Sequence, residues 1–119
     1  MTTKEIAKRL AELCGKGEFE QAQKELFADD AISIEPQATP DFEKETKGLD
    51  AICEKGRKFQ SMIEERHSVS TSQPLTASNS IAMVLYMDVT MKGKGRRNMQ
   101  ELCVYTVKDG KIGSEEFFM

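Results

Sequence analysis

The feature that most constrains the fold of this chain is the long alternating segment Ser80–Met91. Successive side chains of a strand point to opposite faces, so a period of two gathers one set of side chains on each face. One face carries only apolar residues: Ile81, Met83, Leu85, Met87, Val89 and Met91. The other face is mixed: Ala82, Val84, Tyr86, Asp88 and Thr90. The pattern predicts a long strand with one face in a core.

The segments that follow continue this strand pattern. After a turn at residues 92–96, residues 98–107 alternate again. One face of this second segment holds Met99, Glu101, Cys103, Tyr105 and Val107. Residues 108–111 contain the Asp-Gly pair typical of a two-residue hairpin, and they lead into a last strand at residues 112–119. With a polar strand at residues 67–72, the sequence predicts an antiparallel meander of three or four strands.

The N-terminal half has helical periodicity instead. Thr2 and Glu5 form a capping box ahead of one apolar stripe, and this helix is expected to end near Gly15 and Gly17. A second helix begins at Glu18 and is expected to stop at a turn formed by residues 29–30. A third helix follows residue 48, with its stripe at Leu49, Ile52, Cys53, Gly56, Phe59 and Ile63. Gly56 on that stripe permits close approach of a neighbouring element.

Between the second and third helices, residues 31–35 form a short alternating run that ends at Pro36. Ser33 and Glu35 share one face of this predicted strand. Residues 37–47 hold few apolar side chains and are predicted to form a surface loop that can fold over Glu35. The whole chain, residues 1–119, is therefore expected to form one α+β domain in which a long sheet curls around helices.

Composition limits the possible partners. The formal net charge of -3 gives no general attraction to nucleic acid or to an anionic membrane. The longest apolar run, residues 81–87, is far shorter than the roughly 20 residues of a membrane span. The N-terminal segment is amphipathic rather than signal-like, and we therefore expect a cytoplasmic protein.

The three cysteines do not suggest a metal site. Cys14, Cys53 and Cys103 are far apart in the sequence and are not part of a C-x-x-C or histidine-paired motif. Buried free thiols are the expected state. We predict neither a metal nor another cofactor.

Two motifs carry a family resemblance. Residues 26–31 read L-F-A-D-D-A, and the hairpin sequence V-K-D-G-K-I at residues 107–112 is followed by E-F-F at 116–118. In order and spacing the chain resembles the NTF2-like superfamily over its whole length, and in particular the SnoaL-like branch. The resemblance implies a cone-shaped, cystatin-like α+β barrel with three helices packed on a curved, mostly antiparallel sheet. It also implies an internal pocket and frequent homodimers, whereas the functions of the superfamily range from isomerases and polyketide cyclases to binding modules.

The ketosteroid isomerases of this superfamily suggest a catalytic position. Their L-F-A-D-D-A segment leads to an Asp-Pro pair whose aspartate is the general base, and the matching pair here is Glu35-Pro36. Their two oxyanion donors, a tyrosine and a protonated aspartate, match approximately Leu10 and Cys103. Neither residue donates a strong hydrogen bond, so the resemblance implies a base without the donors that complete a steroid isomerase.

Three polar residues are candidates for catalysis. Glu35 is either a general base against an apolar pocket or a strand-end carboxylate in water. Glu101 interrupts an apolar face and is either an acid facing Glu35 or the partner of His67 or an arginine. His67, the only histidine, either transfers a proton or is a structural strand residue.

Further residues are candidates for the pocket wall. Tyr105 shares a face with Glu101, and Cys103, Met99 and Phe59 lie on apolar faces that either line a pocket or fill a core. The function we expect is binding of a small apolar or cyclic molecule, with proton-transfer chemistry of the isomerase or cyclase type and Glu35 as base. A non-catalytic ligand-binding or interaction module is the alternative. The mixed face of Ser80–Met91 predicts a homodimer through the outer side of the sheet.

Overall fold

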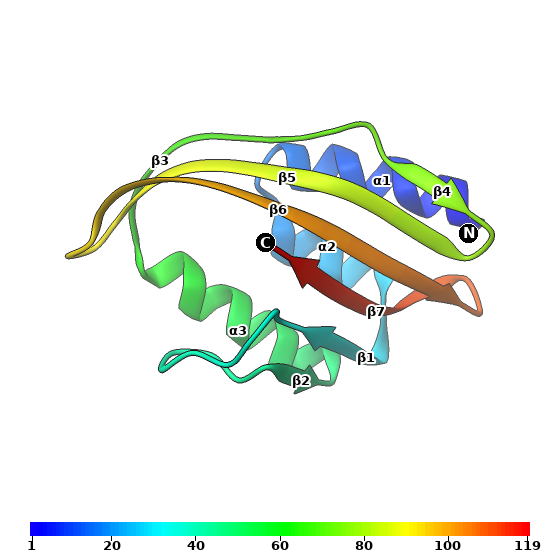
Figure 1. The fold of residues 1–119 in the computed structure, drawn as a ribbon. Helices are drawn as coiled ribbons and strands as arrows, with labels where there is room; N and C mark the ends of the chain where they lie inside the picture. Colours follow the sequence, from blue (N-terminus) through cyan, green and yellow to red (C-terminus); the bar gives the residue numbers. More distant parts are fainter.

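The computed structural model describes all 119 residues, and its fold is a single curved sheet that bends across three helices (Figure 1). The helices are α1 (Thr3–Gly15), α2 (Phe19–Leu26) and α3 (Leu49–Ser61). The strands are β1 (Phe27–Ile34), β2 (Glu45–Lys47), β3 (Ile63–Thr71), β4 (Leu75–Ala77), β5 (Ser80–Met91), β6 (Gly95–Lys108) and β7 (Lys111–Phe118).

The strand order is β2-β1-β7-β6-β5-β3, and β4 pairs with β5 beside β3. Only the β1–β7 pair is parallel, and all other pairs are antiparallel. The prediction of an α+β fold with three helices on a curved, mostly antiparallel sheet is confirmed.

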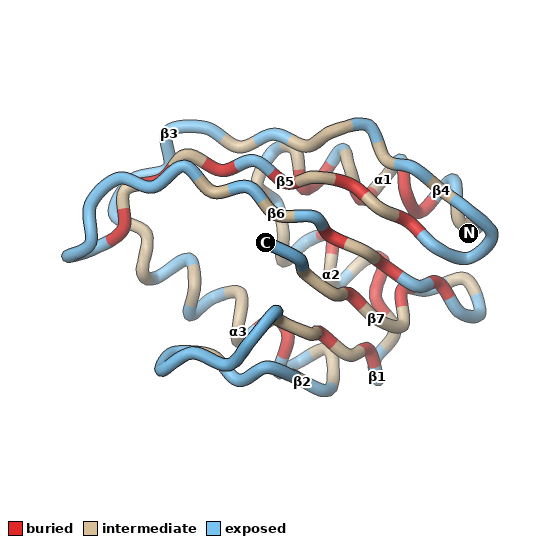
Figure 2. Tube along the Cα trace, in the orientation of Figure 1, coloured by how far each residue is buried: buried red, intermediate tan, exposed pale blue.

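The local signals in the sequence set several element ends. The Glu5 backbone N–H donates to Thr2 Oγ1 over 3.2 Å, and the Thr2 N–H donates to Glu5 Oε1 over 2.8 Å, which completes the capping box. At the β6–β7 hairpin, Asp109 and Gly110 both have positive φ angles, 53° and 76°, as a tight two-residue turn requires. Strand β5 has the predicted ends, and the six apolar residues of its inner face are all buried (Figure 2).

Other ends differ from the prediction. Residues 29–30 do not form a turn, because β1 already begins at Phe27 and these two aspartates lie within an irregular part of the ladder with β7. Their side chains stay exposed while the backbone runs on towards Ile32. The predicted loop at 37–47 contains β2, which pairs with the end of β1. Strand β3 starts at Ile63, which therefore belongs to the sheet and not to the third helix.

The packed core lies where α1 and α2 cover the sheet. Helix α1 buries five side chains, Ile6, Ala7, Leu10, Leu13 and Cys14, against residues of β5, β6 and β7. Helix α3 buries only Ile52 and Cys53, and its Gly56 faces the Gln23 side chain of α2 at a distance that leaves room for a Cβ, so the predicted close approach is not found. None of the helices has the length and apolar character needed to cross a membrane.

Candidate functional site

A cavity of about 1060 Å³ separates α3 from the inner face of β5, β6 and β7. Most of its wall is apolar and includes aromatic and methionine side chains from every layer of the fold. Its lining residues include Leu10, Cys14, Glu35, Phe42, Lys55, Phe59, Met83, Leu85, Met87, Met99, Glu101, Cys103, Tyr105, Glu115 and Phe117. A space of this size and character is typical of small-molecule sites.

Strand register arranges the sheet wall of the cavity in rows. Tyr105 of β6 lies opposite Glu115 of β7, and Cys103 lies opposite both Met83 and Phe117. Glu101 lies opposite Leu85. Because residues directly opposite one another in an antiparallel pair point to the same face, these rows give one continuous wall that is apolar apart from the Tyr105 hydroxyl, the Cys103 thiol and two carboxyls.

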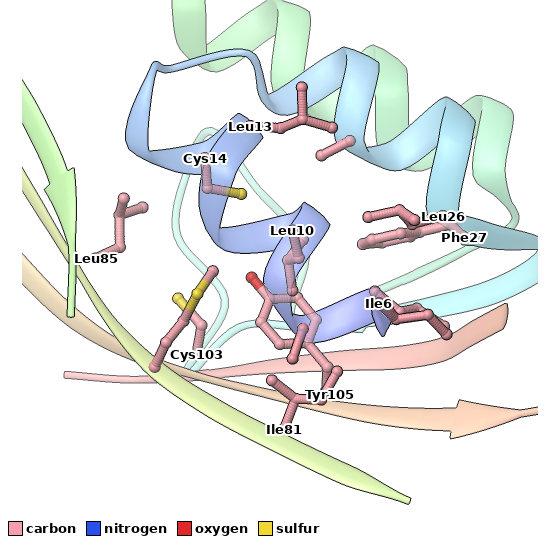
Figure 3. Close-up of a cluster of buried hydrophobic side chains, with 14 of the residues drawn as sticks. Ile6, Leu10, Leu13, Cys14, Leu26, Phe27, Ile81, Leu85, Cys103 and Tyr105 are labelled. Carbon is pink, nitrogen blue, oxygen red and sulfur yellow. The ribbon is translucent and has the colours of Figure 1, made fainter. Parts of the chain in front are cut away.

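Helix α1 contributes Leu10 and Cys14 to the cavity wall, and both lie near Tyr105 and Cys103 of β6 in Figure 3. The Tyr105 hydroxyl points into the space between Leu10, Cys14 and Cys103. Burial raises the pKa of Tyr105 well above its usual value and raises the pKa of Cys14 to about 12. The pKa of the Cys103 thiol is raised as well, first by burial and then by the neighbouring Glu101. These groups stay protonated near neutral pH and offer donors rather than nucleophiles.

A chain of charged hydrogen bonds links α3 to β1 and β7. The Lys55 ammonium of α3 donates to Glu35 Oε2 over 2.9 Å and to Ser33 Oγ over 2.6 Å. The Ser33 hydroxyl in turn donates to Glu115 Oε2 over 2.7 Å. Ser33 is 0% exposed and Glu115 is 4% exposed. Because β1 and β7 are paired in parallel with Ser33 beside Glu115, the sheet itself holds this contact.

Two carboxyls of the cavity have strongly altered proton affinity. Burial raises the pKa of Glu115 to about 7, although the hydrogen bond from Ser33 and the charge of Lys55 lower it. Burial also raises the pKa of Glu101 to about 7, and the negative charges of Glu35 and Glu115 add to that increase. The only hydrogen bond to the Glu101 carboxylate is a weak one from Cys103 Sγ at 3.9 Å. Each group is thus close to half protonated at neutral pH.

The structure brings together most of the residues predicted from the sequence. The carboxylates Glu35 and Glu101 line the cavity, and so do all four predicted wall residues, Tyr105, Cys103, Met99 and Phe59. The sheet face that forms the wall is the one that carries Glu101 and Tyr105. The loop between β1 and β2 also contributes, because the Phe42 ring packs 6.4 Å from the Phe59 ring.

His67 lies elsewhere. Its side chain is on the exposed strand β3, where Nε2 is 2.7 Å from Thr90 Oγ1 and Nδ1 is 2.9 Å from Glu65 Oε2. It is not a cavity residue and does not pair with Glu101. The reason is that His67 lies at an irregularity of the β3–β5 ladder and contacts Thr90, which belongs to the outer face of β5. The arginine partner considered for Glu101 is not found either.

Two important residues were missed by the sequence reasoning. Lys55 lies three positions after Ile52 and four before Phe59, so its place on the apolar stripe of α3 was a usable signal. Glu115 had no such signal. A regular hairpin from the Asp-Gly turn pairs Tyr105 with Ser114, whereas Gly113 forms a bulge that shifts Glu115 into that position.

This arrangement has the parts of an acid–base site. Glu35 is a carboxylate at the end of β1, Glu101 is a carboxylic acid for about half of the time at pH 7, and the cavity wall around them is largely apolar. Lys55 is the cation beside these carboxyls, since Arg57 is already paired with Glu20 over 2.9 Å. Such a pair of groups can remove a proton from carbon and stabilise the resulting charge on an adjacent oxygen.

Comparison with protein families and solved structures agrees with the fold. The family model of the SnoaL-like domain matches residues 1–119. A crystal structure from Mesorhizobium loti, of a protein whose name gives both a SnoaL-like polyketide cyclase and a carbohydrate phosphatase, is 35% identical in sequence. The match covers 100% of both chains with a TM-score of 0.91.

Two less similar structures share the fold alone. A Xanthomonas campestris protein with a cystatin-like fold is 16% identical, with a TM-score of 0.81 over 99% of this chain and 90% of its own. An NTF2-like protein of Burkholderia pseudomallei is 13% identical, with a TM-score of 0.78 over 100% and 92%. The expected cone-shaped, cystatin-like fold is therefore confirmed. No curated protein matches the chain.

Proposed function

The chain belongs to the SnoaL-like domain family, and on that premise we propose that it binds a small apolar cyclic carbonyl compound and transfers a proton on it, with Glu35 as the base. The reaction is of the isomerase or cyclase type and uses the carboxyls of the chain itself. Glu35 removes a proton from the carbon next to the carbonyl, so the C–H bond breaks and an O–H bond forms on the carboxyl. The electron pair moves onto the carbonyl oxygen of the ligand.

The observation that carries this proposal is Glu101. A carboxyl group whose pKa is raised to about 7 in an apolar cavity is available as a hydrogen-bond donor to the developing oxyanion. The positions of the isomerase donors hold Leu10 and Cys103, which cannot fill that role. Glu101 lies on the same face of β6 as Cys103, two residues before it, and supplies the missing donor.

The wall supports the class of ligand. Phe59, Met99 and Phe117 surround the carboxyls with flexible and aromatic apolar surface that suits a ring system. Tyr105 and Cys103 add neutral donors deeper in the cavity. The name of the similar protein from Mesorhizobium loti includes a polyketide cyclase beside a carbohydrate phosphatase, and the first of these agrees with a cyclic, carbonyl-bearing ligand.

Deuterium exchange tests the proposed chemistry. Cyclic ketones and hydroxyaromatic compounds that raise the melting temperature are incubated with the protein in D₂O, and NMR follows loss of the proton next to the carbonyl. We expect the wild type to accelerate exchange and Glu35→Gln to lose at least about a hundredfold of that rate, the usual contribution of a general base. Glu116→Gln is the matched control, because Glu116 is on the same strand as Glu115 and outside the cavity wall. No acceleration by the wild type with any bound ketone contradicts catalysis.

One observation favours the alternative of a non-catalytic binding module. Glu35 Oε2 already accepts a hydrogen bond from the Lys55 ammonium, so this carboxylate has a partner within the protein. A module of this kind binds the same class of ligand without exchange, and Glu35→Gln then leaves the affinity unchanged. The exchange experiment separates the two functions.

The outer face of the sheet supports a homodimer. Leu102 lies opposite both Val84 and Phe118, and it is 41% exposed while Phe118 is 46% exposed. With Tyr86, these residues form an apolar band across β5, β6 and β7 on the side away from the helices. We assign this band to a second copy of the chain. Analytical ultracentrifugation of Leu102→Lys against the wild type tests it: a monomeric variant supports the dimer, and a monomeric wild type contradicts it.

We also place the protein in the cytoplasm. Cys14, Cys53 and Cys103 are free thiols and all three are buried, as expected for a reducing compartment. Fractionation of cells that produce the tagged protein checks this proposal.

A further inference from the structure

Behind the proposed base lies a buried carboxyl that the proposed reaction does not use. Glu115 is 4% exposed and contacts the Ser33 hydroxyl, which is itself 0% exposed. An unpaired buried carboxylate is costly, and a chain that only needed a packed strand would have an apolar residue there. The position of Glu115 depends on the bulge at Gly113, a local irregularity of the kind that often re-aims a side chain near a functional site.

The hydrogen bonds show what Glu115 is connected to. Ser33 has one hydroxyl proton, which it donates to Glu115, so its lone pair is free to accept from Lys55 over 2.6 Å. The same ammonium donates to Glu35 over 2.9 Å. Lys55 therefore lies between two carboxyls of the cavity, Glu35 and Glu115, and the Ser33 hydroxyl links it to Glu115.

We propose that Glu115 is a positioning residue for Glu35: it is the second counter-ion of Lys55 and balances that charge when Glu35 accepts a proton. The use of this arrangement in turnover rests on the proposed function, whereas the coupling itself does not. With Glu115 ionised, Lys55 has two counter-ions, Glu35 and Glu115. Glu35 can then be neutralised without leaving the ammonium unpaired. With Glu115 protonated, Glu35 is the sole counter-ion of Lys55, so neutralising Glu35 leaves the ammonium without a counter-charge.

The other charged or titratable groups around Glu115 do not provide this balance. Glu101, Tyr105 and Cys103 of β6 and Cys14 of α1 feel its charge from the sheet side and from α1, and none of them is a cation. Glu35 acts on it from the end of β1. Lys55 of α3 is the one cation that affects its proton affinity, so any exchange of counter-ion passes through Lys55.

The test is a titration of glutamate carboxyls by ¹³C NMR, with signals assigned from Glu→Gln variants. In the wild type we expect Glu115 to titrate at a pH of about 7. Glu35→Gln imitates the neutral, protonated base and leaves Lys55 to Glu115 alone. We therefore expect the pKa of Glu115 to fall by about one unit or more in that variant. Glu116→Gln, the matched change on the same strand, leaves the titration of Glu115 unchanged.

Two backgrounds show whether Lys55 carries the coupling. In Lys55→Met, Glu35→Gln should shift the pKa of Glu115 by less than half as much as it does in the wild type. Ser33→Ala keeps every charge and removes only the hydroxyl, so it serves as the milder variant if Lys55→Met does not fold, and it should also reduce the shift. An unchanged pKa of Glu115 in Glu35→Gln overturns the proposal, and so does an equal shift in either background.

A second readout links the coupling to turnover. Glu115→Gln keeps a hydrogen-bond acceptor for Ser33 and removes the charge, so we expect the exchange rate of a bound ketone to fall about tenfold with KM unchanged. The acidic side of the pH–rate profile, where the rate rises as Glu115 ionises, should disappear in that variant, whereas the fall on the alkaline side as Glu101 loses its proton should remain. If the wild type shows no exchange but the NMR coupling is found, the proposed function fails and the counter-ion role stands. If exchange is found without the coupling, the proposed function stands and the counter-ion role is overturned.

Discussion

Helices α1 and α3 each contain 13 residues with one apolar stripe, yet they do different things in the fold. Helix α1 lies against the sheet and buries five side chains. Helix α3 buries two, and the rest of its stripe faces a cavity. The amphipathic pattern says which side of a helix faces inward but not whether the sheet meets it there. One end of the inner sheet face is covered by α1 and forms the packed core, and the other end faces α3 across the cavity.

The largest difference between α1 and α3 is expected in the free energy of unfolding when an apolar side chain of each helix is truncated. Ile6 of α1 is 0% exposed, so Ile6→Ala should lower the free energy of unfolding by about 2–5 kcal/mol. Phe59 of α3 is only half-buried and faces the cavity, so Phe59→Ala should cost about 1 kcal/mol in spite of its larger side chain. Urea unfolding of both variants is the measurement. Equal losses would mean that α3 is packed as α1 is.

The buried carboxyl Glu115 of the cavity should also make the free energy of unfolding depend on pH. The pKa of Glu115 is about 7 in the fold and near 4.5 when exposed, so the folded state holds a proton that the unfolded state has lost between these values. Stability is therefore full below a pH of about 4.5 and falls as the pH rises to about 7, by about 3 kcal/mol from this group. Unfolding of Glu115→Gln from pH 5 to pH 8 should lack that loss. A variant that follows the wild-type pH curve would show that Glu115 is not the group responsible.

Ligand binding should report on Glu101. If its protonated form donates to the ligand carbonyl, the affinity falls as the pH rises through about 7, by about tenfold between pH 6 and pH 8. Glu101→Gln carries a permanent neutral donor and should bind equally at both pH values. Calorimetric titration of a cyclic ketone into each protein provides the comparison. A wild-type affinity that is flat with pH removes Glu101 from the donor role.

The smallest effect is expected at His67, which is part of neither the packed core nor the cavity wall. Its side chain is exposed on β3 and contacts only Thr90 and Glu65 among polar partners. We expect His67→Ala to change stability by less than about 0.5 kcal/mol and to leave ligand affinity unchanged. Denaturant midpoints and the same calorimetric titration check both. A weakened affinity would extend the site to the far edge of the sheet.

Much of the fold followed from local patterns. The period of two in Ser80–Met91 allowed only one face to be buried, the Thr2–Glu5 capping box started α1 where it was expected, and the Asp-Gly turn set the last hairpin. These signals depend on residues close in sequence, where backbone geometry and hydrogen bonding act directly. The same patterns placed Glu35 and Glu101 on faces that could meet.

The tertiary structure decided which further charged groups, Lys55 and Glu115, meet Glu35 and Glu101 at the cavity. The sequence pattern around the Asp-Gly turn put Glu115 on the outer side, and the bulge at Gly113 turned it inward to Ser33. Lys55 reached both carboxyls only because α3 stands off the sheet by the width of a cavity. The sequence by itself determined the strands, the helices and the faces they bury, since these depend on local geometry. The strand register, the separation of α3 from the sheet and the pairing of the buried charged groups depend on contacts between residues far apart in the chain. Only the tertiary structure therefore decides them.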